Sequence, residues 1–257
     1  MSNASQPNHK SPEYGNWVPL KLIGMFGGLT LLFIGLSLVF APLFIGVVLC
    51  SLSLGYFAYA RFKLSPRGGD LQARIRELVL DRFEWEGSGK AIDIGCGNAS
   101  LAIALAIRFP SAHVVGVDYW SGKWNYSMRA CEKNAASEGV SSRVSFQKAS
   151  ASALPFEDGY FDAAVSNLVF HEVSDAKDKR QVVREALRVV KKGGKFAFQD
   201  LFLEKRIYGE VSELLDEIKR FGVQDVQFLD TSHLEFIPRA LRLKFMLGAI
   251  GIISGTK

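Results

Sequence analysis

Hydrophobic and polar positions divide this chain into two regions with different patterns. From Leu22 to Ala60, 39 consecutive residues include no Asp, Glu, Lys, Arg or His. Beyond Arg67, short apolar runs alternate with segments in which apolar side chains recur every three or four residues, the period of an amphipathic helix. The first pattern is typical of membrane helices and the second of a globular α/β domain.

The apolar region is too long for a single membrane crossing. One continuous helix of this length would extend about 58 Å, twice the hydrocarbon core of a bilayer. Because Pro42 disfavours helix at Ala41, we predict two helices, at about Leu22–Phe40 and Leu43–Ala60. Small residues on the first helix are expected to let the second helix approach closely. They are Gly24, Gly27, Gly28, Gly35 and Ser37.

These boundaries define the predicted domains: a disordered polar tail over residues 1–17, a transmembrane hairpin over residues 18–63, and a globular domain over residues 64–257. A secretory signal peptide cleaved after Ala60 is one alternative, but the apolar part of a signal is only about 7–15 residues long. A buried helical hairpin in a soluble protein, or an interfacial segment that re-enters without spanning, also fits this composition.

Basic residues are concentrated beside the hairpin. The chain has 31 Lys and Arg against 26 Asp and Glu, a net charge of +5. Residues 1–67 contain five basic residues and one acidic residue, a net of +4, so residues 68–257 contribute only +1. This distribution is that of a membrane flank and argues against a nucleic-acid partner. Since both ends of the hairpin are positive, we expect both termini and the globular domain to be cytoplasmic.

Strands and helices alternate through the globular region. This alternation favours an α/β fold with a doubly wound, mostly parallel, seven-stranded sheet that carries helices on both faces. Among the helices, one is predicted at Trp124–Ser137 and another at Asp175–Lys192, the latter ended by Gly193 and Gly194. The predicted strands are Ala91–Ile94, His113–Val117, Val144–Lys148, Phe161–Asn167, Lys195–Gln199, Val226–Leu229 and Met246–Ser254.

The turn after the first predicted strand has the composition of a ligand-binding turn. Gly95 and Gly97 allow a tight turn and let a ligand approach the backbone. Asp118 ends the next strand, where a carboxylate accepts hydrogen bonds from ribose hydroxyls. Asp93 lies two residues before the first glycine and favours a cationic ligand over a phosphate. The pattern indicates a nucleoside with a cationic group rather than NAD, whose sites prefer G-x-G-x-x-G/A.

Four motifs, in order along the chain, resemble those of the class I S-adenosylmethionine (SAM) dependent methyltransferases. They are AIDIGCGNA, VVGVDYW, ASALPFEDGYFDAAVSNLVFHEV and RVVKKGGKFAFQD. The resemblance covers roughly residues 70–257 and does not include the hairpin. It implies a seven-stranded sheet whose last strand is antiparallel, SAM as the cofactor, and methyl transfer as the reaction.

On the methionine side of SAM, the resemblance implies contacts from the glycine turn. Asp93, Gly95 and Gly97 would hold the methionine part, with Cys96 in the same cofactor-binding turn. Asn167, at the end of the fourth predicted strand, would lie near the methionine amine. Cys96 is read as a small turn residue, and the cysteines and histidines show no spacing typical of a metal site.

On the nucleoside side, the resemblance places Asp118 on the ribose and Tyr119 beside the adenine. Ser150 and Ala151 fall where the family has an acidic residue followed by alanine in contact with the adenine. Ser150 therefore departs from the family pattern and weakens the expectation of a direct contact with the adenine amino group. A second departure is Ala99, which replaces a frequent glycine.

A general base is needed in methyl transfer only when the nucleophile carries a proton of high pKa. The candidate is His171, just beyond the fourth predicted strand, with Glu172 beside it. The competing interpretation is a structural histidine at a helix start, bonded to the backbone. The stretch SNLVF is not an Asn-Pro-Pro-aromatic motif, so methylation of an amide nitrogen is not indicated.

Four functions compete for this sequence. The first is a membrane-anchored SAM-dependent methyltransferase that acts on a small, lipophilic acceptor such as a lipid or a quinone-like head group. Arg239, Arg242 and Lys244 are expected to add a second basic contact to the membrane. The others are a methyltransferase of a water-soluble small molecule, a non-catalytic SAM-binding membrane protein, and an NAD-dependent oxidoreductase. Neither the acceptor nor the oligomeric state follows from the sequence.

Overall fold

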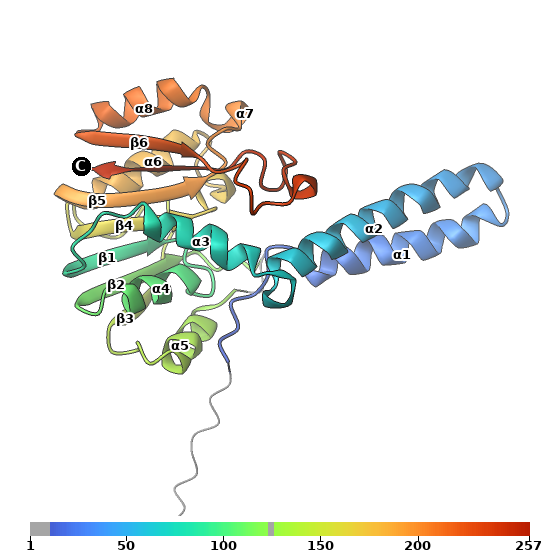
Figure 1. Ribbon diagram of the computed structural model, residues 1–257, viewed down its shortest axis with the longest axis horizontal. Coiled ribbons are helices and arrows are strands. Elements are labelled where there is room, and N and C mark those ends of the chain that lie inside the picture. Colours follow the sequence, from blue (N-terminus) through green and yellow to red (C-terminus); the bar gives the residue numbers. More distant parts are fainter. Residues whose placement is uncertain (1–10, 123–125) are drawn as a thin grey trace, which may run out of the picture. The chain divides into compact units, whose positions relative to one another are not determined.

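The protein divides into two compact units in the computed structural model, which describes residues 11–122 and 126–257. One unit is Asn16–Ile75, and the other comprises Met1–Gly15 and Arg76–Lys257 (Figure 1). Two sequence predictions fall partly outside the described residues: the first ten positions of the predicted polar tail, and Trp124 at the predicted start of a helix.

The smaller unit contains two long apolar helices, α1 (Leu20–Ser37) and α2 (Phe44–Leu64), joined through a short 3-10 turn, η1 (Ala41–Leu43). Spans Leu20–Ser37 and Ala41–Leu64 are long and apolar enough to cross a membrane, with mean hydropathy 1.8 and 1.9. Only 0% and 11% of these spans are buried inside the structure. Most side chains of the two spans therefore lie outside any buried core of the structure.

The two helices pack through aromatic side chains rather than through the glycines of the first helix. The predicted close approach at Gly24, Gly27, Gly28 and Gly35 is wrong, because a Cβ built on any of them meets no described atom within 4 Å. The close contact is made by the second helix instead, where a Cβ on Gly46 would lie 2.5 Å from the ring of Phe33. The rings of Phe26 and Phe57 also stack, 5.4 Å apart.

The larger unit is built on the predicted seven-stranded sheet. Its strands are ordered β3-β2-β1-β4-β5-β7-β6, and β7 runs antiparallel to both of its neighbours while the other pairs are parallel. The strands are β1 (Gly89–Ile94), β2 (Ala112–Asp118), β3 (Val144–Lys148), β4 (Phe161–Asn167), β5 (Val190–Asp200), β6 (Asp225–Asp230) and β7 (Gly251–Thr256).

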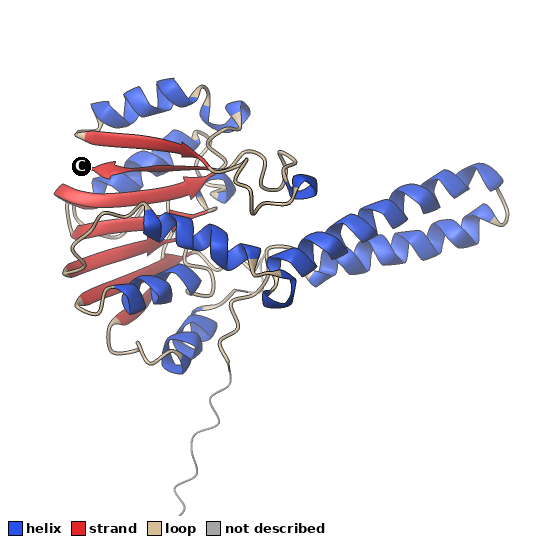
Figure 2. Cartoon of the chain, viewed as in Figure 1, coloured by secondary structure: helices blue, strands red, loops and turns tan. Residues whose placement is uncertain are grey.

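Helices cover both faces of this sheet, as expected for a doubly wound α/β fold (Figure 2). On one face, α3 (Leu71–Asp81), α4 (Ser100–Arg108) and α5 (Met128–Ser137) contribute to a core with Ala91, Ala163 and Val165. On the other, α6 (Lys179–Arg188) and α8 (Val211–Arg220) enclose Ile92, Ile94 and Phe198. Because strand residues alternate between the two faces, the short apolar runs β1, β4 and β5 supply both cores.

The fifth strand starts earlier than predicted and the helix before it is shorter. Helix α6 ends at Arg188, and Val190 already pairs with Phe161 of β4. Gly193 and Gly194, predicted to end the helix, lie within β5, where the register shifts between Phe161 and Ala163. A Cβ on Gly194 would come within 2.8 Å of the Asp162 carbonyl oxygen, so glycine is required by strand pairing there.

The last strand begins later than predicted, at Gly251 rather than Met246. The apolar run before it folds into turns in which the amides of Met246 and Gly248 both donate to the carbonyl of Leu243. Leu247 and Ile250 are buried in these turns. These apolar side chains therefore fill the interior of a loop. A short run of apolar residues in the sequence does not distinguish such a loop from a strand.

Candidate functional site

Three polar side chains lie near the carboxyl edge of the sheet around β1, where the strand order reverses. The first strand lies between β2 and β4, so the turn that follows it is at the switch point, where open α/β sheets bind their ligands. That turn, Gly95 to Ala99, leads directly into α4. The sheet thus brings Asp93, Asp118 and Asn167 close to the N-terminal end of one helix.

The glycine turn has a backbone that most residues cannot adopt. Gly95 and Gly97 have φ of +75° and +57°, in the left-handed region that favours glycine. A Cβ on Gly95 would also collide with Val169 in the loop after β4. Ala99, the position where the sequence departs from a frequent glycine, is fully buried and also left-handed, with φ of +68°. Its backbone is therefore strained relative to glycine.

Asp118 secures this turn from the end of β2. One carboxylate oxygen accepts the Gly97 amide at 2.9 Å and the other accepts the Trp120 amide at 2.7 Å. The Trp120 indole nitrogen in turn donates to the Gly97 carbonyl at 2.9 Å. Burial raises the pKa of Asp118, and the hydrogen bonds from Trp120 and Gly97 oppose that shift. Tyr119, next in the chain, is 59% exposed.

Asp93 and Asn167 each present an acceptor with no hydrogen-bond partner among the described residues, Asp93 through Oδ2 and Asn167 through Oδ1. Asp93 pairs in register with Val165 of β4, so Asn167, two residues on, lies on the same sheet face. Burial raises the pKa of Asp93 to about 7; a hydrogen bond from the Ala102 backbone lowers it, and the charge of Asp118 adds to the rise. Buried acceptors are nearly always paired, so this pair of oxygens is suited to a donor supplied by a ligand.

The beginning of the chain is held beside the glycine turn by two asparagines that sequence reasoning missed. The Glu13 amide donates to Asn134 Oδ1 at 2.9 Å, and the Glu13 carbonyl accepts from Asn134 at 3.2 Å and from Asn98 at 3.3 Å. Asn134 also donates to the Asn98 carbonyl at 3.0 Å. These contacts join α5, the turn and residues 13–15 into one hydrogen-bonded group.

Ser150 does not stand alone at the position where the resemblance expects an acid. Its hydroxyl lies 2.7 Å from Asp175 Oδ2, and the Ser152 hydroxyl donates to the same oxygen at 2.8 Å. The hydrogen bonds from Ser150 and Ser152 lower the pKa of Asp175. A carboxylate is therefore present beside Ser150, supplied by a different segment of the chain. Ala151 beside it is 8% exposed.

His171 lies in a short 3-10 turn after β4, η3 (Phe170–Glu172), and is paired with a buried carboxylate. Its Nδ1 is 2.8 Å from Asp200 Oδ1 at the end of β5. Since a carboxylate only accepts, Nδ1 is the donor, and in the neutral ring Nε2 keeps its lone pair, 3.7 Å from Glu172 Oε1. Burial lowers the pKa of His171, but the charge and hydrogen bond of Asp200 and the charge of Glu172 outweigh it, so the pKa is raised.

Asp200 is a further residue that the sequence analysis did not single out. Its carboxylate is fully buried and accepts the amides of Val169 and Phe170 on one oxygen, at 3.0 and 2.8 Å, and that of Leu201 on the other, at 2.7 Å. It therefore fixes both the loop that carries His171 and the orientation of the imidazole. The predicted structural alternative, a histidine bonded to backbone, does not match this side-chain pair.

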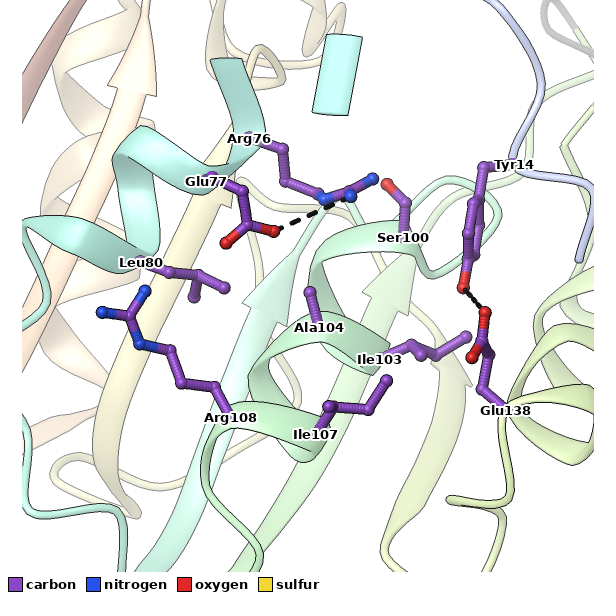
Figure 3. Close-up of a pocket in the computed structure, with 10 residues that line it drawn as sticks. All are labelled: Tyr14, Arg76, Glu77, Leu80, Ser100, Ile103, Ala104, Ile107, Arg108 and Glu138. Atoms are coloured by element: carbon purple, nitrogen blue, oxygen red, sulfur yellow. Dashed lines mark hydrogen bonds and ion pairs between the residues drawn. The ribbon is translucent and has the colours of Figure 1, made fainter. Parts of the chain in front are cut away.

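A separate cavity of about 360 Å³ lies over α4 (Figure 3). Its charged groups have partners within the protein: Arg76 pairs with Glu77 at 3.8 Å, Glu138 accepts from the Tyr14 hydroxyl at 3.2 Å, and Arg108 pairs with Asp81 outside the cavity at 2.9 Å. The rest of the lining is mainly aliphatic and includes Leu80, Ile103, Ala104 and Ile107. Neither the predicted base nor the predicted cofactor residues line it, so we place the functional site at the carboxyl edge of the sheet.

Comparison with known proteins shows which domain this chain resembles. Residues 92–198 match the family model described as a methyltransferase domain. Methyltransferase GfsG of Streptomyces halstedii is 32% identical over 130 residues, which cover 50% of this chain and 43% of that protein. The ubiquinone/menaquinone biosynthesis C-methyltransferase UbiE of Geobacter sulfurreducens is 26% identical over 189 residues, covering 69% of this chain and 70% of that protein.

Among solved structures, the fold is similar to that of geranyl diphosphate C-methyltransferase from Streptomyces coelicolor, crystallised with Mg²⁺, geranyl diphosphate and S-adenosyl-L-homocysteine. The TM-score is 0.53 at 16% sequence identity, with 74% of this chain and 80% of that chain covered. At this identity the likeness shows the fold alone. The family match on residues 92–198 covers the glycine turn, Asp118, Asn167 and His171.

Proposed function

We propose that this chain, whose α/β unit is a class I SAM-dependent methyltransferase domain, methylates a small lipophilic acceptor at a membrane. The observation that carries the acceptor class is the pair of apolar helices α1 and α2, which are long enough to span a bilayer and are almost entirely unburied. The relative from Geobacter sulfurreducens, named as a C-methyltransferase of ubiquinone and menaquinone biosynthesis, supports the same class.

The cofactor of this domain is SAM, and the described residues fit it. The unpaired oxygens of Asp93 and Asn167 are suited to the ammonium group of the methionine part. Gly95 and Gly97 keep the turn free of side chains where the cofactor passes the backbone. Cys96, buried within that turn, supports its shape.

On the nucleoside side, Asp118 is proposed to accept the ribose hydroxyls with the lone pairs that Gly97 and Trp120 leave available. Tyr119 and Ala151 flank the adenine. Ser150 acts with Asp175, whose carboxylate it contacts, in place of the acid that the family has at this position.

SAM held there would supply a methyl group on a sulfonium: the acceptor nucleophile would bond to the methyl carbon in line as the carbon–sulfur bond breaks, and neutral S-adenosylhomocysteine would leave. The protein's own part is to orient the acceptor and to remove its proton where the nucleophile is a hydroxyl. His171 Nε2 is the proposed base, because Asp200 holds the hydrogen on Nδ1 and stabilises the imidazolium that forms. Such a base contributes roughly 10²- to 10⁴-fold in rate.

We also propose that α1 and α2 form a membrane hairpin with both termini and the α/β unit on the cytoplasmic side. Basic residues lie in the first turn of α1, at Lys21, and in the last turn of α2, at Arg61 and Lys63. Positive flanks favour retention on the cytoplasmic side.

The test uses the full chain in nanodiscs with SAM labelled in its methyl group. Label should enter material from a lipid extract and not from an aqueous extract of the same cells.

His171→Asn should reduce turnover 10²-fold or more while SAM still binds, as expected for a lost general base. His113→Asn, an exposed histidine at the opposite edge of the sheet, is the matched control and should be unchanged. Transfer only to the aqueous extract would replace the lipophilic acceptor by a soluble one. SAM binding without transfer to either extract would contradict the catalytic proposal.

A further inference from the structure

We infer that the loop between β6 and β7, residues 231–250, is a second membrane contact that lays the α/β unit against a bilayer containing anionic lipids. This inference rests on the proposed membrane-bound function. It adds a surface on the α/β unit itself, independent of the hairpin.

The loop stands at the edge of the sheet where the candidate site lies. Gly251, where β7 begins, pairs with Asp200 of β5 and Asp230 of β6. The amide of Leu203, just beyond β5, donates to the Ala249 carbonyl at 3.1 Å. The loop (red in Figure 1) therefore extends from the same edge as the pair of His171 and Asp200.

The loop is a compact structure with its own interior. Leu241, Leu247 and Ile237 are 0%, 2% and 1% exposed. Arg242, predicted from sequence as a cation facing the membrane, is turned inward and donates to the carbonyls of Ile237 and Leu234, both at 3.1 Å. Because these contacts close the loop on itself, the side chains that point outward are held in place.

The outward face combines apolar and basic side chains. Phe245 is 66% exposed, the largest value among the exposed large hydrophobic residues of the described α/β unit, and Leu243 is 44% exposed. Lys244 lies between them and Arg239 is also exposed, whereas the acidic residue of the loop is Glu235. Aromatic and aliphatic side chains among cations are typical of interfacial membrane contacts, where rings enter the headgroup region and cations meet anionic lipids.

The experiment measures how deeply the loop enters a bilayer. The full chain, with Cys50 replaced by Ser, carries a nitroxide label at Leu243→Cys, since Cys96 and Cys131 are buried. It is reconstituted in nanodiscs of phosphatidylcholine with or without about 30% phosphatidylglycerol, the anionic probe. Collision of the label with oxygen, which enriches in lipid, is compared with collision with a water-soluble nickel chelate.

The label at Leu243→Cys should collide several-fold more with oxygen than with the nickel chelate when anionic lipid is present. Lys192→Cys, at an exposed position on the opposite edge of the sheet, should report water. Arg239→Glu with Lys244→Glu should remove the preference for anionic lipid. Each cation contributes about fivefold to such binding. Lys192→Glu, the matched charge control, should leave the preference unchanged.

Three results would overturn the inference. The label at Leu243→Cys could report water, or it could be shielded from both oxygen and the nickel chelate, which would mean that protein covers this face. The third is no effect of Arg239→Glu with Lys244→Glu on the preference for anionic lipid. A label at Leu31→Cys in α1 separates this outcome from failure of the membrane proposal itself. If Leu31→Cys reports lipid while Leu243→Cys reports water, only the loop inference fails.

Discussion

Asp93 in β1 and Asp200 at the end of β5 are both buried carboxylates near the same edge of one sheet, at 1% and 0% exposure. Their surroundings differ. Asp200 accepts three backbone amides and the His171 ring, whereas one oxygen of Asp93 has no partner among the described residues. The Asp200 carboxylate is fully hydrogen-bonded within the protein and holds a loop. The Asp93 carboxylate lacks a hydrogen-bond donor for one oxygen and is suited to a cationic ligand.

The comparison has a physical lesson about where a buried charge is stable. A buried carboxylate that is fully hydrogen-bonded stabilises the structure around it, while an unpaired one costs free energy and becomes easier to protonate. The raised pKa of Asp93 is the sign of that cost. The edge of the sheet thus contains a rigid half around β5 and a half around β1. The half around β1 is stabilised when a ligand pairs with the Asp93 carboxylate.

The largest expected effect tests the rigid half. Asp200→Ala removes the acceptor for three backbone amides, one buried and two partly buried, and is expected to lower the free energy of unfolding by about 3–5 kcal/mol. Denaturant unfolding of the full chain in detergent, followed by intrinsic fluorescence, measures it. Asp216→Ala, an exposed carboxylate on α8, is the control. A loss below about 1 kcal/mol, the ordinary range of surface substitutions, would contradict the assignment of Asp200 as a structural anchor.

The opposite sign is expected at Asp93. Because its pKa is raised in the folded chain from 3.8 to about 7, the folded state binds the extra proton between these values, and stability without SAM falls as pH rises through this window. Asp93→Asn should remove that slope and stabilise the SAM-free chain at pH 8 by about 2–4 kcal/mol, yet lose SAM binding. Unfolding curves at pH 5 and 8, with calorimetric titration of SAM, test both. Equal slopes in the two proteins would contradict the linkage.

The third prediction concerns the pH dependence of turnover. The base form of His171 is neutral, and its pKa is raised above the ordinary 6.5, so kcat should fall on the acid side at a pH above 6.5. Asp200→Asn removes the negative charge and should move this limb to lower pH while reducing kcat by roughly 10²-fold or more. If the acid limb of the kcat profile stays at the same pH in Asp200→Asn, the group that titrates is not His171.

A smaller effect is expected on the adenine side. Asp175→Asn weakens the hydrogen bonds with Ser150 and Ser152 and should raise the Kd for SAM by about three- to tenfold, since the net worth of one hydrogen bond is about 0.5–1.5 kcal/mol. The control is Ser152→Ala, which keeps the contact between Ser150 and Asp175 and should change affinity less. Unchanged binding in Asp175→Asn would exclude the carboxylate from the adenine subsite.

The smallest effect is expected at Ala99. Glycine would relieve the left-handed strain, worth about 1–2 kcal/mol, but would also lose a buried methyl group and gain freedom in the unfolded chain. These terms nearly cancel, so Ala99→Gly should change stability by less than about 1 kcal/mol and leave SAM affinity unaltered. A thermal shift larger than that would mean that the methyl group has a role in packing that this balance omits.

The sequence was informative where local chemistry determines the structure. The glycine turn, Asp118 at a strand end and the presence of seven strands all follow from short-range patterns, whereas the order of the strands in the sheet was not predicted. The boundaries near Val190 and Met246 were wrong, because strand pairing and loop packing over long separations decided them. Asp200 was missed for a similar reason: it ends an apolar strand, and only the fold brings it to His171. Asn98 and Asn134 gave no signal, since their partner is the backbone of a residue near the chain start.

The hydrogen bonds of Asn98 and Asn134 to the Glu13 backbone have a consequence for how related sequences diverge. These hydrogen bonds go to the amide and carbonyl of Glu13 and do not involve its side chain. Any residue except proline, which lacks the amide hydrogen, can therefore make the same hydrogen bonds at position 13. Drift at position 13 is therefore tolerated, whereas a change at 98 or 134 needs a compensating change at the other. Among descendants of this gene, those two positions are expected to vary together while the residue that they hold varies freely.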